Sequence, residues 1–132
     1  MNNKPNEQLE IMAKNVLQKA GLDNDERFGS VIAILMMISI ILTVIRILQE
    51  CNKKSTLNMT AKDKSLIYAE NIRSYSKKRG WFTKLRIKRI LKKELSPNDY
   101  NKYYMRLTEA LLDTGESLTD DEVYTLVEAA NV

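Results

Sequence analysis

The sequence predicts an all-α protein that combines one long apolar helix with a small bundle of amphipathic helices. Only four glycines and two prolines interrupt 132 residues, and eighteen consecutive residues from Phe28 to Ile45 carry no charge. Elsewhere, apolar residues recur at intervals of three and four, which places them on one face of a helix. The mean hydropathy of −0.35 is that of a soluble protein, so the hydrophobicity is concentrated in the one uncharged segment.

The first helix is expected from about Pro5 to Ala20. Its apolar residues return every three or four positions, which is typical of a helix with one buried face, and Gly21 supplies a stop signal. So narrow an apolar face has to lie against another element. The residues predicted to share it are Leu9, Met12, Ala13, Val16, Leu17 and Ala20.

The second helix is expected over about residues 26–50 and includes the uncharged run. Asp23 to Glu26 offer capping and acidic side chains that favour the positive end of its dipole. At a rise of about 1.5 Å per residue, the run measures about 27 Å, close to the hydrocarbon thickness of a bilayer. Three settings remain open: a membrane span, the intersubunit core of a homo-oligomer over residues 28–48, or a central helix covered by the rest of the chain.

A thin polar stripe follows the C-terminal half of the apolar helix. Helical spacing brings four polar residues within about 60° of one another. They are the predicted helix-interface candidates: Ser39, Thr43, Arg46 and Glu50. Such a stripe is expected to face a neighbouring helix, because Ser and Thr allow close approach and hydrogen bonding. Arg46 would either reach lipid headgroups or pair with Glu50 at an interface.

Four further helices are expected near residues 60–78, 81–95, 97–113 and 119–131. Capping-box patterns begin three of them, at Thr60, Ser96 and Thr119. Gly80 and Gly115 are the expected helix ends. Each helix carries an apolar stripe, so the four can close one small bundle. The stripe expected on the helix near residues 81–95 consists of Trp81, Leu85, Ile87, Ile90 and Leu91.

The chain divides into two expected domains. Residues 1–52 hold the first helix and the apolar anchor or oligomerisation helix, and residues 60–132 form a charged domain like a four-helix bundle. The polar stretch between them is the linker candidate. Each piece can bury only a modest core, which favours a partner.

A dense cluster of positive charge lies in the second domain. Nine of the seventeen residues from 77 to 93 are Lys or Arg, and no acidic residue lies between Glu70 and Glu94. Interleaved apolar residues make this stretch a cationic amphipathic helix led by a tryptophan, which suits anionic lipid headgroups or nucleic-acid phosphates. The predicted anionic-partner residues are Lys77, Lys78, Arg79, Trp81, Lys84, Arg86, Lys88, Arg89, Lys92 and Lys93.

Internal pairing is another explanation for this charge. After Arg106 the chain has seven acidic residues and no basic one, so the basic segment can pair with residues 109–128 within one molecule or between copies. Exposed ion pairs contribute about 0–1 kcal/mol each, so such pairing would set orientation more than stability.

The residues for common catalytic and metal chemistry are missing from the sequence. It has no histidine and one cysteine, which excludes histidine-dependent catalysis and an intrachain disulfide and leaves no usual zinc site. Phosphate-loop and nucleophile-elbow motifs do not occur. We therefore expect no enzyme, no catalytic, cofactor or metal site, and no small-molecule substrate.

Together these features predict a non-enzymatic structural or assembly protein that is anchored by one membrane-spanning helix and self-associates. The alternatives are a soluble, virion-like homo-oligomer, and an accessory protein that binds anionic lipid or nucleic acid through residues 77–93. Basic residues after the apolar helix predict a membrane location with a cytoplasmic C-terminal domain; the alternative is a virion or a cytoplasmic assembly. In layout alone, the chain resembles small phage-encoded membrane or virion proteins, including single-span holins.

Overall fold

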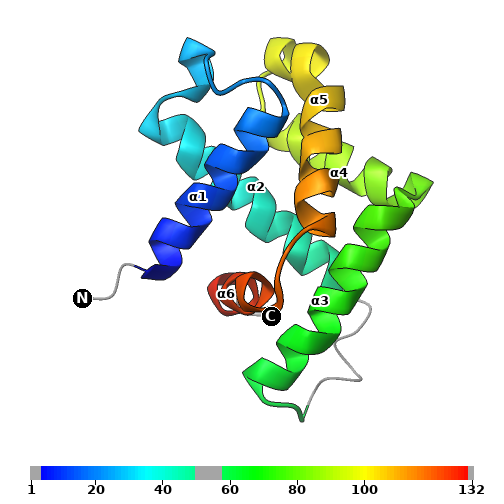
Figure 1. The fold of residues 1–132 in the computed structure, drawn as a ribbon. Helices are drawn as coiled ribbons and strands as arrows, with labels where there is room; N and C mark the ends of the chain where they lie inside the picture. Colours follow the sequence, from blue (N-terminus) through cyan, green and yellow to red (C-terminus); the bar gives the residue numbers. More distant parts are fainter. Residues whose placement is uncertain (1–3, 50–57, 131–132) are drawn as a thin grey trace.

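The computed structural model describes residues 4–49 and 58–130, and these ranges contain helices and no strand. The all-α class is therefore confirmed. Figure 1 shows the elements, which are α1 (Lys4–Lys19), the 3₁₀ turn η1 (Glu26–Phe28), α2 (Val31–Gln49), α3 (Ala61–Lys78), α4 (Trp81–Glu94), α5 (Pro97–Glu116) and α6 (Asp120–Ala130).

Capping side chains begin the helices of the C-terminal half. Thr60 and Ser96 each accept a hydrogen bond from the backbone N–H three residues later, at 3.2 Å. Thr119 and Glu122 cap each other: the Glu122 N–H donates to the Thr119 hydroxyl at 3.2 Å, and the Thr119 N–H donates to the Glu122 carboxylate at 2.9 Å. The three predicted caps are confirmed, because a capping box depends only on local geometry.

The apolar helix predicted over residues 26–50 is not found as one continuous helix. Residues 26–28 form η1, and α2 begins only at Val31. Asp25 caps η1 by accepting a hydrogen bond from a backbone N–H at 2.9 Å. Ser30 then starts α2 by accepting from the N–H three residues later, at 3.1 Å. Gly29 and Ser30, near the start of the uncharged run, were the sequence signal for this break.

A polar network fastens η1 to the start of α5. Arg27 donates to the Asp99 carboxylate at 2.7 Å and to the Tyr103 hydroxyl at 2.5 Å, and that hydroxyl donates to Asp25 at 3.0 Å. The rings of Phe28 and Tyr103 meet edge to face, with centroids 5.3 Å apart. The backbone N–H of Arg27 lowers the pKa of Asp25 and outweighs the opposing effect of desolvation. The network holds η1 against α5, so the turn does not join α2.

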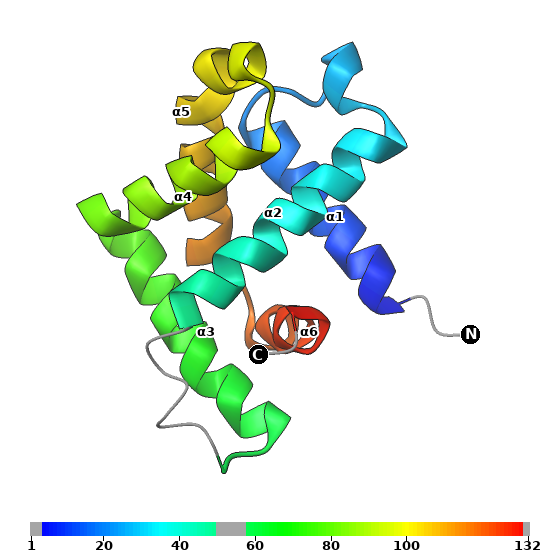
Figure 2. The same cartoon turned by 180° about the vertical axis from the view of Figure 1, so that it is seen from behind.

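Helix α2 packs as one helix of the bundle. It contacts mainly α1, α4 and α6, and it lies beside α4 on the face shown in Figure 2. This packing matches the setting in which the rest of the chain covers the apolar helix. The cover is incomplete, because Val31, Ile32 and Leu35 are exposed. The side chains of α2 that are buried are Ala33, Met37, Ile40, Ile41, Val44 and Ile45.

The helices share one buried apolar cluster. All six residues predicted on the face of the first helix are buried in it, and so are Val123, Leu126 and Val127 of α6. Within the part of the chain that the structure describes, none of the helices is both long enough and apolar enough to cross a membrane. The domain boundary stays a prediction, because most of the linker lies in residues 50–57, outside the described ranges.

Gly115 lies inside α5, although the sequence predicts it as a helix end. The helix continues to Glu116. A Cβ atom added to Gly115 would lie 2.2 Å from the Ser76 hydroxyl oxygen and 3.2 Å from the Ser76 Cβ. The missing side chain therefore allows α3 and α5 to cross closely. No local pattern in the sequence predicts that crossing.

Candidate interface for an anionic partner

The cations of α4 surround a narrow buried stripe. Thr83, Ile87, Ile90 and Leu91 face the bundle. At 100° per residue, the rest of the helix surface divides into a flank towards α5 and a flank towards α2. The two flanks differ in whether their charges are paired within the chain.

The flank towards α5 is occupied by contacts within the chain. The Lys84 ammonium lies 3.5 Å from the Glu109 carboxylate. The Lys88 ammonium lies over the Tyr104 ring, 5.4 Å from its centroid, in a cation–π contact. Both lysines are half-buried. Internal contacts therefore account for this part of the basic cluster.

Arg79 fixes the corner between α3 and α4. Its backbone is left-handed, with φ 50° and ψ 43°, a conformation that costs a residue with a side chain about 1–2 kcal/mol. Its guanidinium pairs with Glu109 at 2.8 Å, with Glu116 at 3.4 Å and with Asp113. The hydrogen bond to Asp113 raises the pKa of Arg79, whereas desolvation lowers it. Arg79, predicted to contact an anionic partner, thus contacts α5.

The flank towards α2 borders an open groove. The groove has a volume of about 680 Å³ and runs between α2 and α4, which lie side by side in Figure 2. None of the described residues that line it carries a carboxylate. Arg86, Arg89 and Lys93 line it and form no ion pair with any residue in the described ranges. The remaining lining residues are Thr43, Ile47, Trp81, Phe82, Leu85 and Ile90.

Trp81 stands at the end of this groove and not on the buried stripe of α4 where its spacing had placed it. Its side chain is 69% exposed, and that of Phe82 is 68% exposed. The two rings meet edge to face with centroids 4.6 Å apart. Phe82 is not among the site residues predicted from the sequence, although two adjacent large aromatic residues after a glycine are a visible signal.

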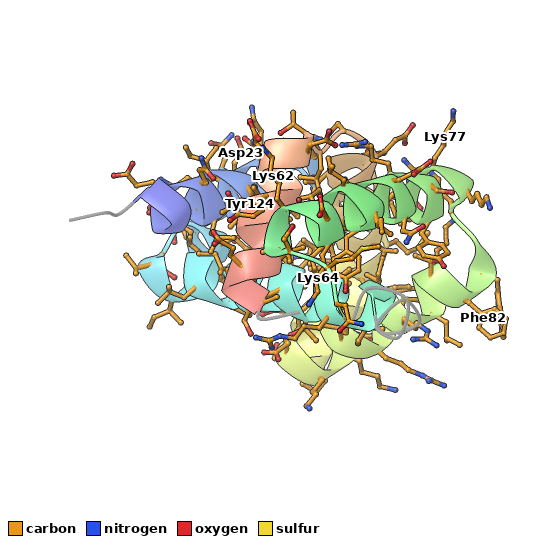
Figure 3. All side chains as sticks on the ribbon, turned by 90° about the horizontal axis from the view of Figure 1, so that it is seen from below. Asp23, Lys62, Lys64, Lys77, Phe82 and Tyr124 are labelled. Carbon is orange, nitrogen blue, oxygen red and sulfur yellow. The ribbon has the colours of Figure 1, made fainter. Side chains whose placement is uncertain are left out.

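The other predicted basic residues lie away from the groove lining. Lys77, Lys78 and Lys92 are exposed, and none of them pairs with a carboxylate in the described part of the chain. Lys77 extends into solvent from the end of α3 (Figure 3). Lys77 and Lys78 add positive charge at the corner and Lys92 adds it at the far end of α4, and none of the three lines the groove.

The predicted helix-interface stripe faces outward. Ser39 is exposed, and its carbonyl accepts a hydrogen bond from the Thr43 hydroxyl at 2.8 Å. Arg46 donates through Nε to the Ala130 carbonyl at 3.0 Å, where a cation favours the negative end of the α6 dipole. Glu50 lies outside the described residues. The stripe therefore uses Arg46 to hold α6 and contributes Thr43 to the groove.

No group of carboxylate and thiol side chains within residues 4–49 and 58–130 is arranged to hold a metal ion. Comparison of the chain with protein-family models, with curated proteins and with solved structures found no match.

Proposed function

We propose that this protein is a non-enzymatic attachment protein that binds an anionic partner through the groove between α2 and α4. The observation that carries the proposal is the contrast between the two flanks of α4. Lys84 and Lys88, towards α5, have partners within the chain, whereas Arg86, Arg89 and Lys93 line a groove in which no described residue carries a carboxylate. Unpaired like charges next to apolar side chains repel one another, so an anionic ligand relieves that repulsion.

The packing of α2 supports peripheral attachment over a spanning anchor. Its buried face contacts α1, α4 and α6, and unpacking the helix into a bilayer would expose the apolar faces of those neighbours. A span over residues 28–45 stays a prediction, and so does the absence of catalysis.

Self-association also stays a prediction. The surface most suited to it is the outward face at the start of α2, where Val31, Ile32 and Leu35 are exposed next to a groove shared with α1. A homo-oligomer built on this face would keep the groove beside α4 open.

Retention on a heparin column tests the proposed site. Changing Arg86, Arg89 and Lys93 to Gln should move elution to markedly lower salt, because each cation that contacts a polyanion steepens the salt dependence of binding. The matched control changes Lys14, Lys19 and Lys62 to Gln, exposed lysines of α1 and α3 outside the groove. Both variants lose three positive charges, so a difference between them isolates the groove.

Equal shifts in the two variants would contradict the proposal, because binding would then follow net charge and not a site. Circular dichroism should report the same helix content in both variants, since all six side chains lie at least partly in solvent.

A further inference from the structure

The aromatic pair at the corner of α3 and α4 projects from the bundle. Phe82 points away from the helices at that end of the molecule (Figure 3). A Cβ atom added to the neighbouring Gly80 would meet nothing within 4 Å, so no described element covers the corner. Two large, adjacent, mostly exposed aromatic side chains are costly to leave in water, which indicates that a partner covers them.

The corner is held in place before any partner arrives. Arg79 adopts the left-handed conformation that turns the chain, and its ion pairs with three carboxylates of α5 secure that turn. Its N–H also donates to the Tyr75 carbonyl at 3.2 Å. Trp81 and Phe82 thus follow a turn whose backbone is already fixed, so little backbone freedom remains to be lost when they dock.

The apolar tip and the cations lie on one surface. Trp81 and Phe82 line the same groove as Arg86, Arg89 and Lys93, with Leu85 between them on α4. Rings that enter the headgroup region and cations that stay at the phosphate level are the two components of interfacial membrane binding. Each component strengthens the other because they act on the same bilayer.

Resting on the proposed function, we infer that the partner is the surface of an anionic lipid bilayer, which takes Trp81 and Phe82 into its interface and binds Arg86, Arg89 and Lys93 through lipid phosphates. Nucleic acid fits this surface less well. Base stacking needs open ring faces, and the edge-to-face contact between the two rings covers a face of one of them.

Trp81 reports directly on this inference, because it is the only tryptophan in the chain. Its fluorescence should shift to shorter wavelength when the protein is mixed with vesicles of phosphatidylcholine and phosphatidylglycerol. Vesicles of phosphatidylcholine alone should produce little shift. Phosphatidylcholine brominated on its acyl chains, included in the anionic vesicles, should quench the emission, which electrostatic adsorption without insertion would not do.

Variants separate the contribution of the inserted aromatic rings from that of the groove cations. Changing both Trp81 and Phe82 to Ala should weaken co-sedimentation with the anionic vesicles by about tenfold or more. The loss should be larger than any loss of heparin retention in the same variant, because heparin offers no bilayer interface for the two rings to enter. The control changes Ile11 and Met105 to Ala, which are exposed apolar residues on α1 and α5. Phe82→Ala alone keeps the reporter and should reduce both the shift and the quenching.

Three outcomes would overturn the inference of a lipid partner. They differ in whether they also reject the proposed function. Groove-dependent heparin retention without a vesicle-induced shift would reject lipid and keep an anionic partner. Tighter binding to single-stranded DNA than to vesicles, with loss of that binding in the Trp81 and Phe82 variant, would identify nucleic acid as the partner. Absence of groove-dependent binding to heparin, vesicles and DNA would reject the proposed function as well.

Discussion

Replacing Ile40 by Asp is expected to lower the free energy of unfolding by about 4 kcal/mol, from lost apolar burial and from an unpaired charge in the core. The Ile40 side chain is fully buried, at 0% exposure, in the middle of α2. A domain of this size has only about 5–15 kcal/mol of stability in total. Urea unfolding followed by circular dichroism would measure the loss, which should appear as a lower midpoint concentration of urea.

The same substitution two turns earlier on α2 provides the control. Ile32 is 80% exposed, so Ile32→Asp should change the free energy of unfolding by only about 0.5 kcal/mol. A similarly small change in the free energy of unfolding at both positions would show that α2 is not packed as described.

Replacing Gly115 by Ala is expected to cost about 1–3 kcal/mol, as overpacking does in other cores. In an open helix this change would instead gain about 1 kcal/mol in helix propensity. The added Cβ would meet the Ser76 side chain, with its oxygen 2.2 Å away and its Cβ 3.2 Å away. A loss of stability in Gly115→Ala would therefore indicate that α3 and α5 cross closely, whereas a gain would indicate an open helix surface. Thermal unfolding of the variant would measure it.

A double-mutant cycle with Ser76→Gly isolates this contact. In that background Gly115→Ala should become neutral or stabilising, because the colliding side chain is gone. Gly29→Ala is a suitable comparison, since the nearest atom to an added Cβ there is 3.8 Å away. If Gly115→Ala changes the stability as little as Gly29→Ala does, α3 and α5 do not cross as closely as described.

Local features of this fold could be predicted from its sequence. The buried face of α1 followed from spacing alone, and the caps at Thr60, Ser96 and Thr119 followed from patterns of four residues. Both depend on interactions within one helix turn or on one helix face. The break before α2 was missed because the long uncharged run outweighed the capping serine at residue 30.

Features that depend on how helices cross could not be predicted. Lys84 and Arg86 are two residues apart in one basic helix, yet Lys84 meets Glu109 whereas Arg86 lines the groove. Which cations are paired depends on the side of α4 against which α5 packs. The same dependence explains the exposure of Trp81, whose place on an apolar stripe was a sound expectation for an isolated helix.

We propose that the chain keeps α2 within its bundle and attaches to an anionic membrane from outside, through the groove and the aromatic tip. Flotation with phosphatidylglycerol-containing vesicles, followed by washes with high salt and then alkaline carbonate, distinguishes this peripheral attachment from a spanning helix. We expect high salt to release folded protein, because screening removes the attraction between the groove cations and the lipid phosphates. Protein that stays with the vesicles through both washes would have inserted a spanning helix, and that result would rule out peripheral attachment.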